Sequence, residues 1–387
     1  MKNNIWFVTR SYPPTKGGGP FVRKQQVEFL ISKGYKVTVL TQPQAAEIDD
    51  TNVVIIDHMV SSRLLRYMER LCLLFDYLFL WSKKVADYII NNAQEGDVIF
   101  ITSGGELGFL QKVQYLKKYR PDLKVVMNYH DLLIYSRYQG QKSFSHPHLP
   151  IDFIERKNIS HVDYVITQSN RMSEILSEKF PMLKNKISSM YFGIPEIYEQ
   201  KKSPSKELIK LVYIGTMGKL QSPEVILDAL KSLPGKIRKK LNITFIGDFK
   251  QNSRIKNSNL VEKISYIPRE ELINRCANEY DYAIVTAQNI RPLETLMPTK
   301  FYEYLGIGIP VLSIVAENCE ISNVIEKYNF GVSVVHGNKE QLVNELINIV
   351  EKYDVSNFRK CVIENRNLLS SNKTLELMCD VIENKLN

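Results

Sequence analysis

Short, continuous runs of apolar residues recur along this chain, separated by small-residue turns and by stretches with helical spacing. Runs of Val and Ile without strict alternation are typical of parallel strands that are buried on both faces. In the first half of the chain these runs are residues 4–9, 37–41, 97–102, 123–129 and 164–167. In the second half they are residues 209–215, 243–248, 264–267 and 282–286, and a further strand follows Pro310. The pattern predicts an α/β protein built from two β–α–β sheets.

The helical pattern is noisier than the strand pattern. Between Phe21 and Lys33 the apolar residues stand at positions 22, 27, 29, 30 and 31, and helical phasing fits them best. The other expected helices are residues 107–119, 171–179, 224–232, 339–352 and 357–387, the last with a break near 370–372. Strands and helices therefore alternate as in folds that bind ligands beyond the carboxyl ends of their strands.

The chain of 387 residues is too long for one ordinary core, and a prior of roughly 150 residues per domain suggests two or three. We expect a first domain at 1–195, a second at 206–365 and a final helix at 366–387. The expected linker is 193–206, which contains Gly, Pro, Glu, Lys and Ser. An apolar content of 44% and a charged content of 24% are typical of a soluble globular protein.

A glycine-rich loop follows the first strand, and it contains Gly17, Gly18 and Gly19. Glycine is needed where a backbone approaches a ligand closely, because a side chain would block that approach. The loop lacks the G-x-G-x-x-G spacing, and no acidic residue ends the second strand. A flexible turn is the alternative interpretation.

The segment from Pro298 to Leu312 (PTKFYEYLGIGIPVL) predicts a short helix that begins at a proline and ends at glycines before a buried strand. The first backbone N–H groups of such a helix lie unpaired at the positive end of its dipole, where they can bind phosphate. Glu303, one turn further in, could accept hydrogen bonds from the vicinal hydroxyls of a sugar. The segment therefore suits a nucleoside diphosphate. An ordinary helix before a core strand is the alternative.

Two motifs together resemble the retaining family 4 glycosyltransferases of the bacterial surface-polysaccharide type. One is this second-domain segment, and the other is the run YPPTKGG just after the first strand. The resemblance implies a GT-B fold, with two Rossmann-like domains that face each other across a cleft. It implies transfer of a sugar from a nucleotide-diphosphate sugar to a glycan or lipid-linked acceptor, with retention, in cell-surface polysaccharide synthesis. It also implies that the last helix crosses back onto the first domain.

His130 lies at the carboxyl end of an expected parallel strand. In the resembled family a histidine at this place contacts the donor sugar and its phosphate, and we expect that role for His130. Asp131 beside it is expected to orient the imidazole or to bind an acceptor hydroxyl. A structural histidine is the alternative.

The chain departs from the family pattern at two places. Many relatives carry Arg and Lys after the first strand of the second domain, and Thr216 and Gln221 hold those positions here. Lys219 between them could supply the missing cation. Many relatives also carry two glutamates eight positions apart, but counting back from Glu303 gives Thr295.

The expected site is therefore as follows. The residues expected to be catalytic are His130, Lys219, Lys300 and Glu303, and Lys300 would act as a point charge against the leaving diphosphate. The residues expected to bind the donor are Gly17, Gly18, Gly19, Gly215, Thr216, Gln221, Thr295, Pro298, Thr299 and Phe301. Asp131 is the expected acceptor contact. The sequence contains no D-x-D pair in a suitable loop, so we expect no metal and no other cofactor.

A net charge of +9 favours anionic partners. No nucleic-acid-binding module is recognisable, so substrate phosphates and anionic lipid are the better candidates. The five cysteines are scattered without a C-x-x-C pair, which is typical of reduced thiols in a cytosolic protein. No secretory pattern opens the chain. We expect a cytoplasmic location, with or without peripheral contact with the inner face of the plasma membrane.

Residues 61–84 are basic at both ends and apolar between. The apolar run at 71–75 is far shorter than the roughly 20 residues of a spanning helix. Two interpretations remain open. The segment is a largely buried helix of the first domain, or it lies in a membrane interface with its basic residues on acidic head groups.

Two other functions stay open beside the transferase. The absence of a glutamate at 295 would suit a catalytically silent GT-B protein that binds nucleotide sugars. A GT-B sugar epimerase would act on the nucleotide sugar without an acceptor.

Overall fold

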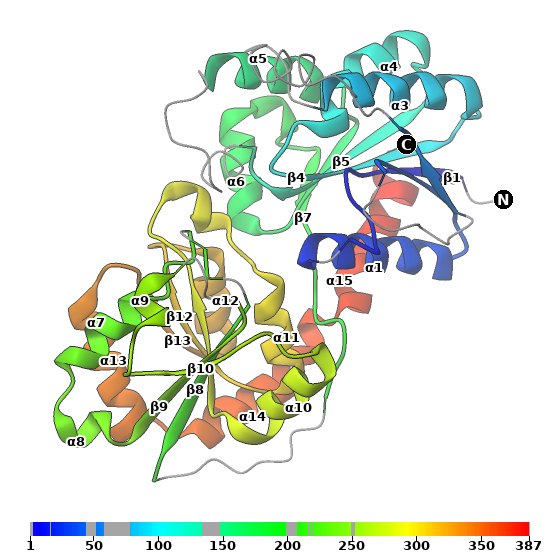
Figure 1. The fold of residues 1–387 in the computed structure, drawn as a ribbon. Helices are drawn as coiled ribbons and strands as arrows, with labels where there is room; N and C mark the ends of the chain where they lie inside the picture. Colours follow the sequence, from blue (N-terminus) through cyan, green and yellow to red (C-terminus); the bar gives the residue numbers. More distant parts are fainter. Residues whose placement is uncertain are drawn as a thin grey trace. The chain divides into compact units, whose positions relative to one another are not determined.

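The computed structural model describes residues 3–15, 17–43, 52–57, 78–133, 148–198, 207–215, 217–218, 220–248 and 252–386. The chain divides into two compact units, which Figure 1 shows as separate α/β bodies. The first comprises Met1–Tyr191 and Thr374–Asn387, and the second comprises Phe192–Lys373. The sequence placed the first boundary near 195 and the start of the last helix at 366. In the structure the chain leaves the first unit after Tyr191 and returns to it at Thr374.

A parallel sheet of seven strands forms the first unit, in the order β3-β2-β1-β4-β5-β6-β7. The strands are β1 (Asn4–Val8), β2 (Lys36–Thr41), β3 (Val53–Ile55), β4 (Val98–Gly104), β5 (Lys124–Asp131), β6 (Tyr164–Thr167) and β7 (Ile187–Ser189). The strand order reverses between β1 and β4, and ligands of open α/β sheets bind at such a switch point, beyond the carboxyl ends of the strands.

The helices of the first unit pack on both faces of this sheet (Figure 1). They are α1 (Gly18–Ser32), α3 (Phe79–Asn92), α4 (Val113–Tyr119), α5 (His148–Ile159), α6 (Asn170–Lys179) and α15 (Ser371–Asp380), with the 3-10 turns η1 (Gly108–Lys112) and η3 (Pro181–Leu183) and the π turn η6 (Val381–Lys385). The sequence began the first helix at Phe21, whereas α1 begins at Gly18. Pro20 lies in its first turn, where the missing N–H of proline costs nothing.

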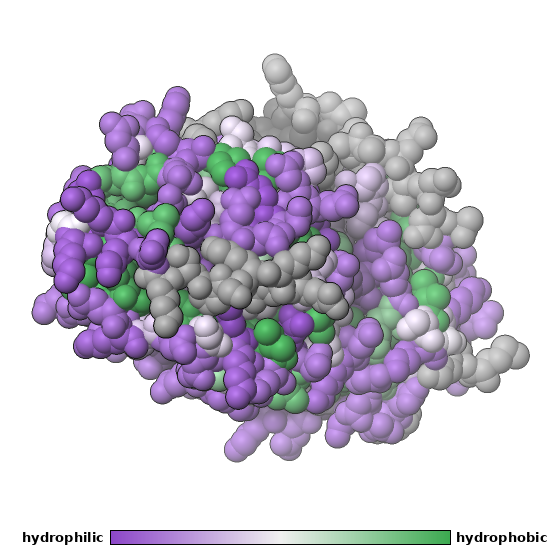
Figure 2. Space-filling view, turned by 90° about the horizontal axis from the view of Figure 1, so that it is seen from below, coloured by the Kyte–Doolittle hydropathy of each residue, from purple (hydrophilic) through white to green (hydrophobic). Residues whose placement is uncertain are grey.

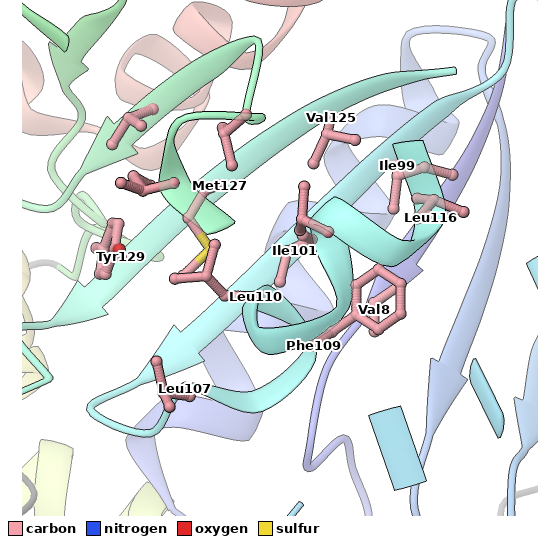
Figure 3. Close-up of a cluster of buried hydrophobic side chains, with 14 of the residues drawn as sticks. Val8, Ile99, Ile101, Leu107, Phe109, Leu110, Leu116, Val125, Met127 and Tyr129 are labelled. Atoms are coloured by element: carbon pink, nitrogen blue, oxygen red, sulfur yellow. The ribbon is translucent and has the colours of Figure 1, made fainter. Parts of the chain in front are cut away.

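Alternate residues of β1 face opposite sides of the sheet and enter two different hydrophobic clusters. Trp6 and Val8 belong to the cluster in Figure 3, where strands β1, β4 and β5 pack against η1 and α4. Ile5 and Phe7 belong to the other cluster, to which α1 and the last helices also contribute. Met378 of α15 is fully buried in that second cluster. The C-terminal segment is therefore part of the core of the first unit.

A parallel sheet of six strands forms the second unit, in the order β10-β9-β8-β11-β12-β13. The strands are β8 (Ile209–Ile214), β9 (Leu241–Ile246), β10 (Glu262–Ile264), β11 (Tyr282–Thr286), β12 (Val311–Val315) and β13 (Gly331–Val335). The strand expected at 264–267 is present, but it lies two to three residues earlier in the chain, at Glu262–Ile264. The ladder ends where the Gly247 N–H donates to the Ile264 carbonyl, and Pro268 then precedes a helix.

The helices of the second unit are α7 (Val225–Ser232), α8 (Gly235–Arg238), α9 (Ser253–Lys256), α10 (Arg269–Glu279), α11 (Thr299–Ile307), α12 (Glu320–Tyr328), α13 (Lys339–Glu351) and α14 (Val355–Asn365), with the 3-10 turns η4 (Arg291–Thr295) and η5 (Arg366–Leu369). The last helical segment was expected at 357–387 with a break near 370–372, and it is divided into α14, η5, α15 and η6. The break is at Ser370, which is extended and bridges to Ile194.

The strand order of the second unit reverses between β8 and β11. These strands pair only where Leu211 and Val212 meet Tyr282 and Ala283. Beyond that point they diverge, and each continues toward its carboxyl end. The divergence leaves backbone groups at the end of β8 to be bonded by other parts of the chain.

Hydrophilic residues predominate on the face shown in Figure 2, and hydrophobic ones lie there in small separate groups. None of the helices within the described ranges combines the length and apolar character needed to cross a membrane. Most of the segment 61–84 lies outside the described residues. Of its basic residues, Lys83 is paired with Asp87 at 2.7 Å, and Lys84 donates to the carbonyl of Asp57.

A buried ion pair fastens α14 to the sheet of the second unit. The carboxylate of Asp281 is fully buried and lies 3.4 Å from the guanidinium of Arg359, whose exposed fraction is 5%. Asp281 also accepts from the Lys210 N–H at 2.9 Å, and Arg359 donates to the Tyr280 carbonyl. Removing one partner of a buried pair leaves the other charge uncompensated.

We predict that Asp281→Ala lowers the free energy of unfolding by about 3–5 kcal/mol, because the buried guanidinium of Arg359 would then lose its carboxylate partner. Urea denaturation followed by circular dichroism measures this loss. Asp228→Ala is the matched control, because its pair with Arg254 is about half exposed, and it should cost no more than about 1 kcal/mol. Equal losses in the two variants would contradict the prediction.

Candidate functional site

Helix α11 of the second unit begins without a side-chain cap. Pro298 is its N-cap residue and not, as the sequence suggested, its first helical residue, because its backbone is extended (φ −71°, ψ 146°). The Phe301 N–H bonds back to the Pro298 carbonyl at 2.9 Å. Pro298, Thr299 and Lys300 are all half-buried. The first amides of the helix, those of Thr299 and Lys300, are thus placed to bind an anion.

The side chain of Lys300 lies against the carboxyl end of β8. Its Nζ donates to the Ile214 carbonyl at 2.9 Å and lies 4.1 Å from the centre of the Tyr213 ring. The next residue, Gly215, has φ +105°, which favours glycine, and a Cβ there would stand 3.5 Å from Nζ. A cation, an exposed glycine turn and a helix N-terminus therefore meet at the switch point of this sheet.

Tyr304 fixes α11 in this position from one turn further along the helix. Its hydroxyl oxygen accepts from the Ile214 N–H at 3.0 Å, in the gap where β8 and β11 diverge. Tyr304 and Lys300 are four residues apart, so they share one face of α11. Both polar backbone groups of Ile214 are thus bonded by side chains of the same helix.

Glu303 lies on the face of α11 that carries Thr299, and it is half-buried. Its Oε1 accepts from Nε of Arg269 at 3.3 Å. The carboxylate is therefore close to the expected phosphate seat and is held by a cation that the sequence did not single out.

Two residues expected to bind the donor have buried side chains. Phe301 is fully buried and packs edge-to-face on Tyr302, so we assign it to the core. Thr295 is buried as well, and its hydroxyl donates to the Pro292 carbonyl within η4. It closes the turn before α11.

The loop after β8 is described only in part. Thr216 and Lys219 lie outside the described residues. Gln221 is half-buried, and its Oε1 would lie 2.8 Å from a Cβ at Gly218, so its side chain lies against that turn.

In the first unit the glycine run also forms a helix N-terminus. Gly17 is the N-cap residue of α1, with φ +131°, and Gly18 and Gly19 lie in the first turn of the helix. No side chain caps this end. The run ends the loop that connects β1 to α1, in which residues 9–16 separate Val8 from Gly17, and a ligand-binding turn of such a fold is expected there.

His130 and Asp131 are the last two residues of β5. His130 is buried, and Nδ2 of Asn128 lies 3.3 Å from its Nε2. Burial, together with the nearby Arg23, lowers the pKa of His130 well below its ordinary value, so the imidazole is neutral at physiological pH. Burial and the neighbouring Glu106 raise the pKa of Asp131 to about 7, and Arg23 partly opposes that rise.

Arg23 of α1 was not identified from the sequence, although it lies at the centre of this cluster. It is 3% exposed, and its Nη1 donates to the carbonyl and the hydroxyl of Ser11, just after β1. Its Nη2 lies 3.1 Å from the place of a Cβ on Gly104, at the end of β4. The ends of β1, β4 and β5 thus meet around one guanidinium, at the switch point of the first sheet.

Glu106 was also missed. It is buried, its Oε1 accepts from the Gly104 N–H at 3.2 Å, and its Oε2 lies 3.8 Å from Nη1 of Arg10. One signal for the cluster was present in the sequence. The buried face of α1 includes Arg23 and Gln26 among its apolar residues, and these polar residues made the helical pattern look noisy.

We predict that Asp131→Asn makes stability less dependent on pH. In the folded protein Asp131 keeps its proton up to about pH 7, whereas the unfolded chain releases it near pH 3.8, so wild-type stability falls as pH rises between these values. Urea denaturation at pH 5 and pH 8 should show a loss smaller in the variant by on the order of 1–3 kcal/mol.

Two features separate Asp131 from its neighbours in this experiment. His130, with a lowered pKa, contributes in the opposite sense, because its stabilising effect is lost as pH falls below about 6.5. Glu106→Gln removes one cause of the raised Asp131 pKa and should give an intermediate result. An unchanged pH dependence in Asp131→Asn would contradict the assignment.

Residues 195–367, most of the second unit, match the family described as glycosyl transferases group 1. The curated protein sequences contain no match to the chain. The N-terminal domain of trehalose-6-phosphate phosphatase from Candida albicans is similar in structure, with a TM-score of 0.68 and 12% identity. That alignment covers 99% of this chain and 97% of the other.

Two glycosyltransferase-related structures are similar over the whole chain as well. WaaG, a glycosyltransferase involved in lipopolysaccharide biosynthesis, has a TM-score of 0.66 and 14% identity, with 98% of this chain and 100% of WaaG covered. HepE from Anabaena, solved in complex with UDP, has a TM-score of 0.63 and 14% identity, with 98% and 99% covered. At such identities these likenesses establish the fold. Most of the second unit is thus similar to the glycosyl transferases of group 1, and the chain as a whole has the GT-B fold.

Proposed function

We propose that this chain transfers a sugar from a nucleoside-diphosphate sugar to a glycan or a lipid-linked saccharide, with retention of anomeric configuration, in bacterial cell-surface polysaccharide synthesis. One observation carries the proposal. The uncapped N-terminus of α11 and the ammonium group of Lys300 converge on the glycine turn after β8, inside the group 1 domain. UDP-sugars are the first donors to test, since HepE was solved with UDP and with UDP-glucose.

In the proposed reaction the diphosphate binds to the amides of Thr299 and Lys300, and Glu303 binds the ribose hydroxyls. The bond from the anomeric carbon to the leaving phosphate breaks, and the acceptor oxygen forms the new bond on the same face. The acceptor proton passes to the departing diphosphate. Lys300, the helix amides and, in our proposal, Lys219 stabilise the developing negative charge, which is commonly the largest catalytic term.

His130 and Asp131 complete the proposal from the first unit. A neutral imidazole can donate one hydrogen bond and accept another, which suits a sugar hydroxyl and a phosphate oxygen. Asp131 is half-buried, so its carboxyl group can bind an acceptor hydroxyl. We also propose that the enzyme works without a metal and at the inner face of the plasma membrane.

A catalytically silent nucleotide-sugar-binding protein is the second candidate. Thr295 stands where many relatives carry a glutamate, and its hydroxyl is already bonded within η4. A sugar epimerase is a third possibility, to be checked in the same assay.

Thermal shifts with a panel of nucleotide sugars should identify the donor. Transfer of labelled sugar to lipid-linked acceptors, in buffer with EDTA, then tests catalysis without a divalent metal. Product after transfer supports the transferase, and NMR of its anomeric centre tests retention. Binding without turnover supports the silent protein, and a changed sugar without any acceptor supports the epimerase.

We predict that Lys300→Ala lowers kcat by about 10²–10³-fold and weakens donor binding far less, because charge on the diphosphate develops in the transition state. Steady-state kinetics and calorimetric titration with the donor separate the two effects. Lys327→Ala is the matched control, because Lys327 also lies over a tyrosine ring but is exposed on α12. Full activity in Lys300→Ala would refute its role.

We predict that Glu303→Ala weakens nucleoside-diphosphate binding by about 10–100-fold, since hydrogen bonds to a charged group contribute about 1.5–3 kcal/mol. Calorimetry with UDP measures the loss. Glu326→Ala changes an exposed glutamate of the neighbouring helix α12 and should bind as the wild type does. If the two variants bind UDP alike, the ribose lies elsewhere.

A further inference from the structure

The chain passes between its two units twice, and the segments next to these passages lie side by side within the second unit. The first, residues 192–198, is called the crossover segment here. The Ile194 N–H donates to the Leu369 carbonyl at 2.6 Å, and the Ser371 N–H donates to the Ile194 carbonyl at 2.9 Å. The bonds form a short parallel bridge between Ile194 and Ser370, so the two passages are tied together.

The crossover segment is also tied to the C-terminal half of α11. The Gly306 carbonyl accepts from the Tyr198 N–H at 3.0 Å and from Nη1 of Arg366 at 2.8 Å. A Cβ on Gly306 would stand only 2.4 Å from the Glu196 carbonyl oxygen, so nothing larger than glycine fits there without a shift. The helix that we propose to seat the nucleotide therefore contacts the crossover segment backbone to backbone.

Arg269 makes a second connection between the same two parts. It is the first residue of α10, and its Nε donates to Oε1 of Glu303 at 3.3 Å. Its Nη1 lies 3.8 Å from Oε2 of Glu196 in the crossover segment, and the Tyr198 hydroxyl bonds to the same carboxylate. One guanidinium thus bridges a carboxylate on α11 and a carboxylate on the crossover segment.

This bridge orients the Glu303 carboxylate more than it stabilises the fold. Arg269 is 46% exposed and Glu303 28%, and ion pairs this accessible to water contribute little to folding. A guanidinium, however, presents its donors in a rigid plane and so fixes the orientation of a carboxylate. With Oε1 held by Arg269, the remaining lone pairs of Glu303 are oriented for other donors, such as vicinal hydroxyls.

We propose that Arg269 is a positioning residue, which orients the Glu303 carboxylate toward the ribose of the nucleotide and links its position to the crossover segment through Glu196. The inference rests on the proposed function, in which Glu303 binds the ribose. Arg269 itself does not contact the nucleotide in this proposal, so its removal should affect recognition of the ribose hydroxyls and not of the phosphates.

The test compares the affinities of UDP and 2′,3′-dideoxy-UDP by calorimetry. A panel of nucleoside diphosphates is measured first. If one with another base binds more tightly than UDP, that diphosphate and its dideoxy form replace UDP and dideoxy-UDP in the comparison. The wild type should prefer the ribose form by at least about tenfold, and Glu303→Ala should abolish the preference. Arg269→Gln should reduce the preference about three- to tenfold, with inorganic pyrophosphate binding unchanged. Arg269→Lys, which keeps the charge without the planar fork, should be intermediate.

Arg275→Gln is the matched control, because Arg275 lies on the same helix and forms a partly exposed pair with Glu279. It should keep the wild-type preference. If Arg269→Gln also keeps that preference, the inference is overturned and the proposed function stands. If the wild type binds UDP without any preference, the assignment of Glu303 and this inference both fail. If no nucleoside diphosphate binds at all, the proposed function fails as well.

Discussion

The structure of the second unit depends on how one residue at the end of β8 is bonded. Ile214 lies beyond the last pairing of β8 with β11, so its N–H and carbonyl lack strand partners on that side. Tyr304 accepts from the N–H and Lys300 donates to the carbonyl. Buried backbone groups must be paired, so this requirement helps to fix the position and the rotation of α11. The ammonium group that completes the pairing lies beside the Gly215 turn, where our proposal places the diphosphate.

In the first unit, too, a helix side chain bonds backbone groups at a strand end, and there the residue is an arginine. The sheet of this unit reverses order between β1 and β4, and Arg23 of α1 binds the backbone of Ser11 just after β1. The guanidinium also reaches Gly104 at the end of β4. In each unit a cation on a helix therefore bonds the backbone at the switch point and leaves positive charge at the carboxyl ends of the strands. In the first unit burial lowers the pKa of His130 and raises that of Asp131, and the charge of Arg23 adds to the first shift and opposes the second.

Much of the fold follows from local sequence, because buried parallel strands leave unbroken apolar runs. The ends of α11 were predictable for a similar reason, since proline and glycine mark the ends of a helix. Helix phasing also argues against Phe301 as a donor-binding residue. It places Phe301 on the same face of the helix as Tyr304 and Leu305, and all three are buried. The pairing of Arg269 with Glu303 has no local signal. The two residues are brought together only by the packing of α10 against α11.

Arg23 and Glu106 represent a different kind of limit. A polar residue on the buried face of a helix weakens the apolar pattern in the sequence. A helix whose apolar positions are merely irregular shows an equally weak pattern. What distinguishes the two cases is the partner, and Ser11, Gly104 and Asp131 come from three separate strand ends. A sequence can show that a buried position is charged, but only the topology of the sheet shows which charges it meets.

The two ends of α11 explain why this helix could link ligand binding to the passage between units. A helix of nine residues is about 13 Å long and behaves as a rigid rod between its termini. Its C-terminal half is held to the crossover segment at Gly306 by contacts in which the proposed ligand takes no part. A ligand shifts a conformational equilibrium only through contacts that differ between the two states. In our proposal the ligand does not change the backbone contacts at Gly306, so these contacts cannot transmit its binding. The Glu303–Arg269–Glu196 chain meets that condition in our proposal, because the ribose hydroxyls and Arg269 bind the same carboxylate.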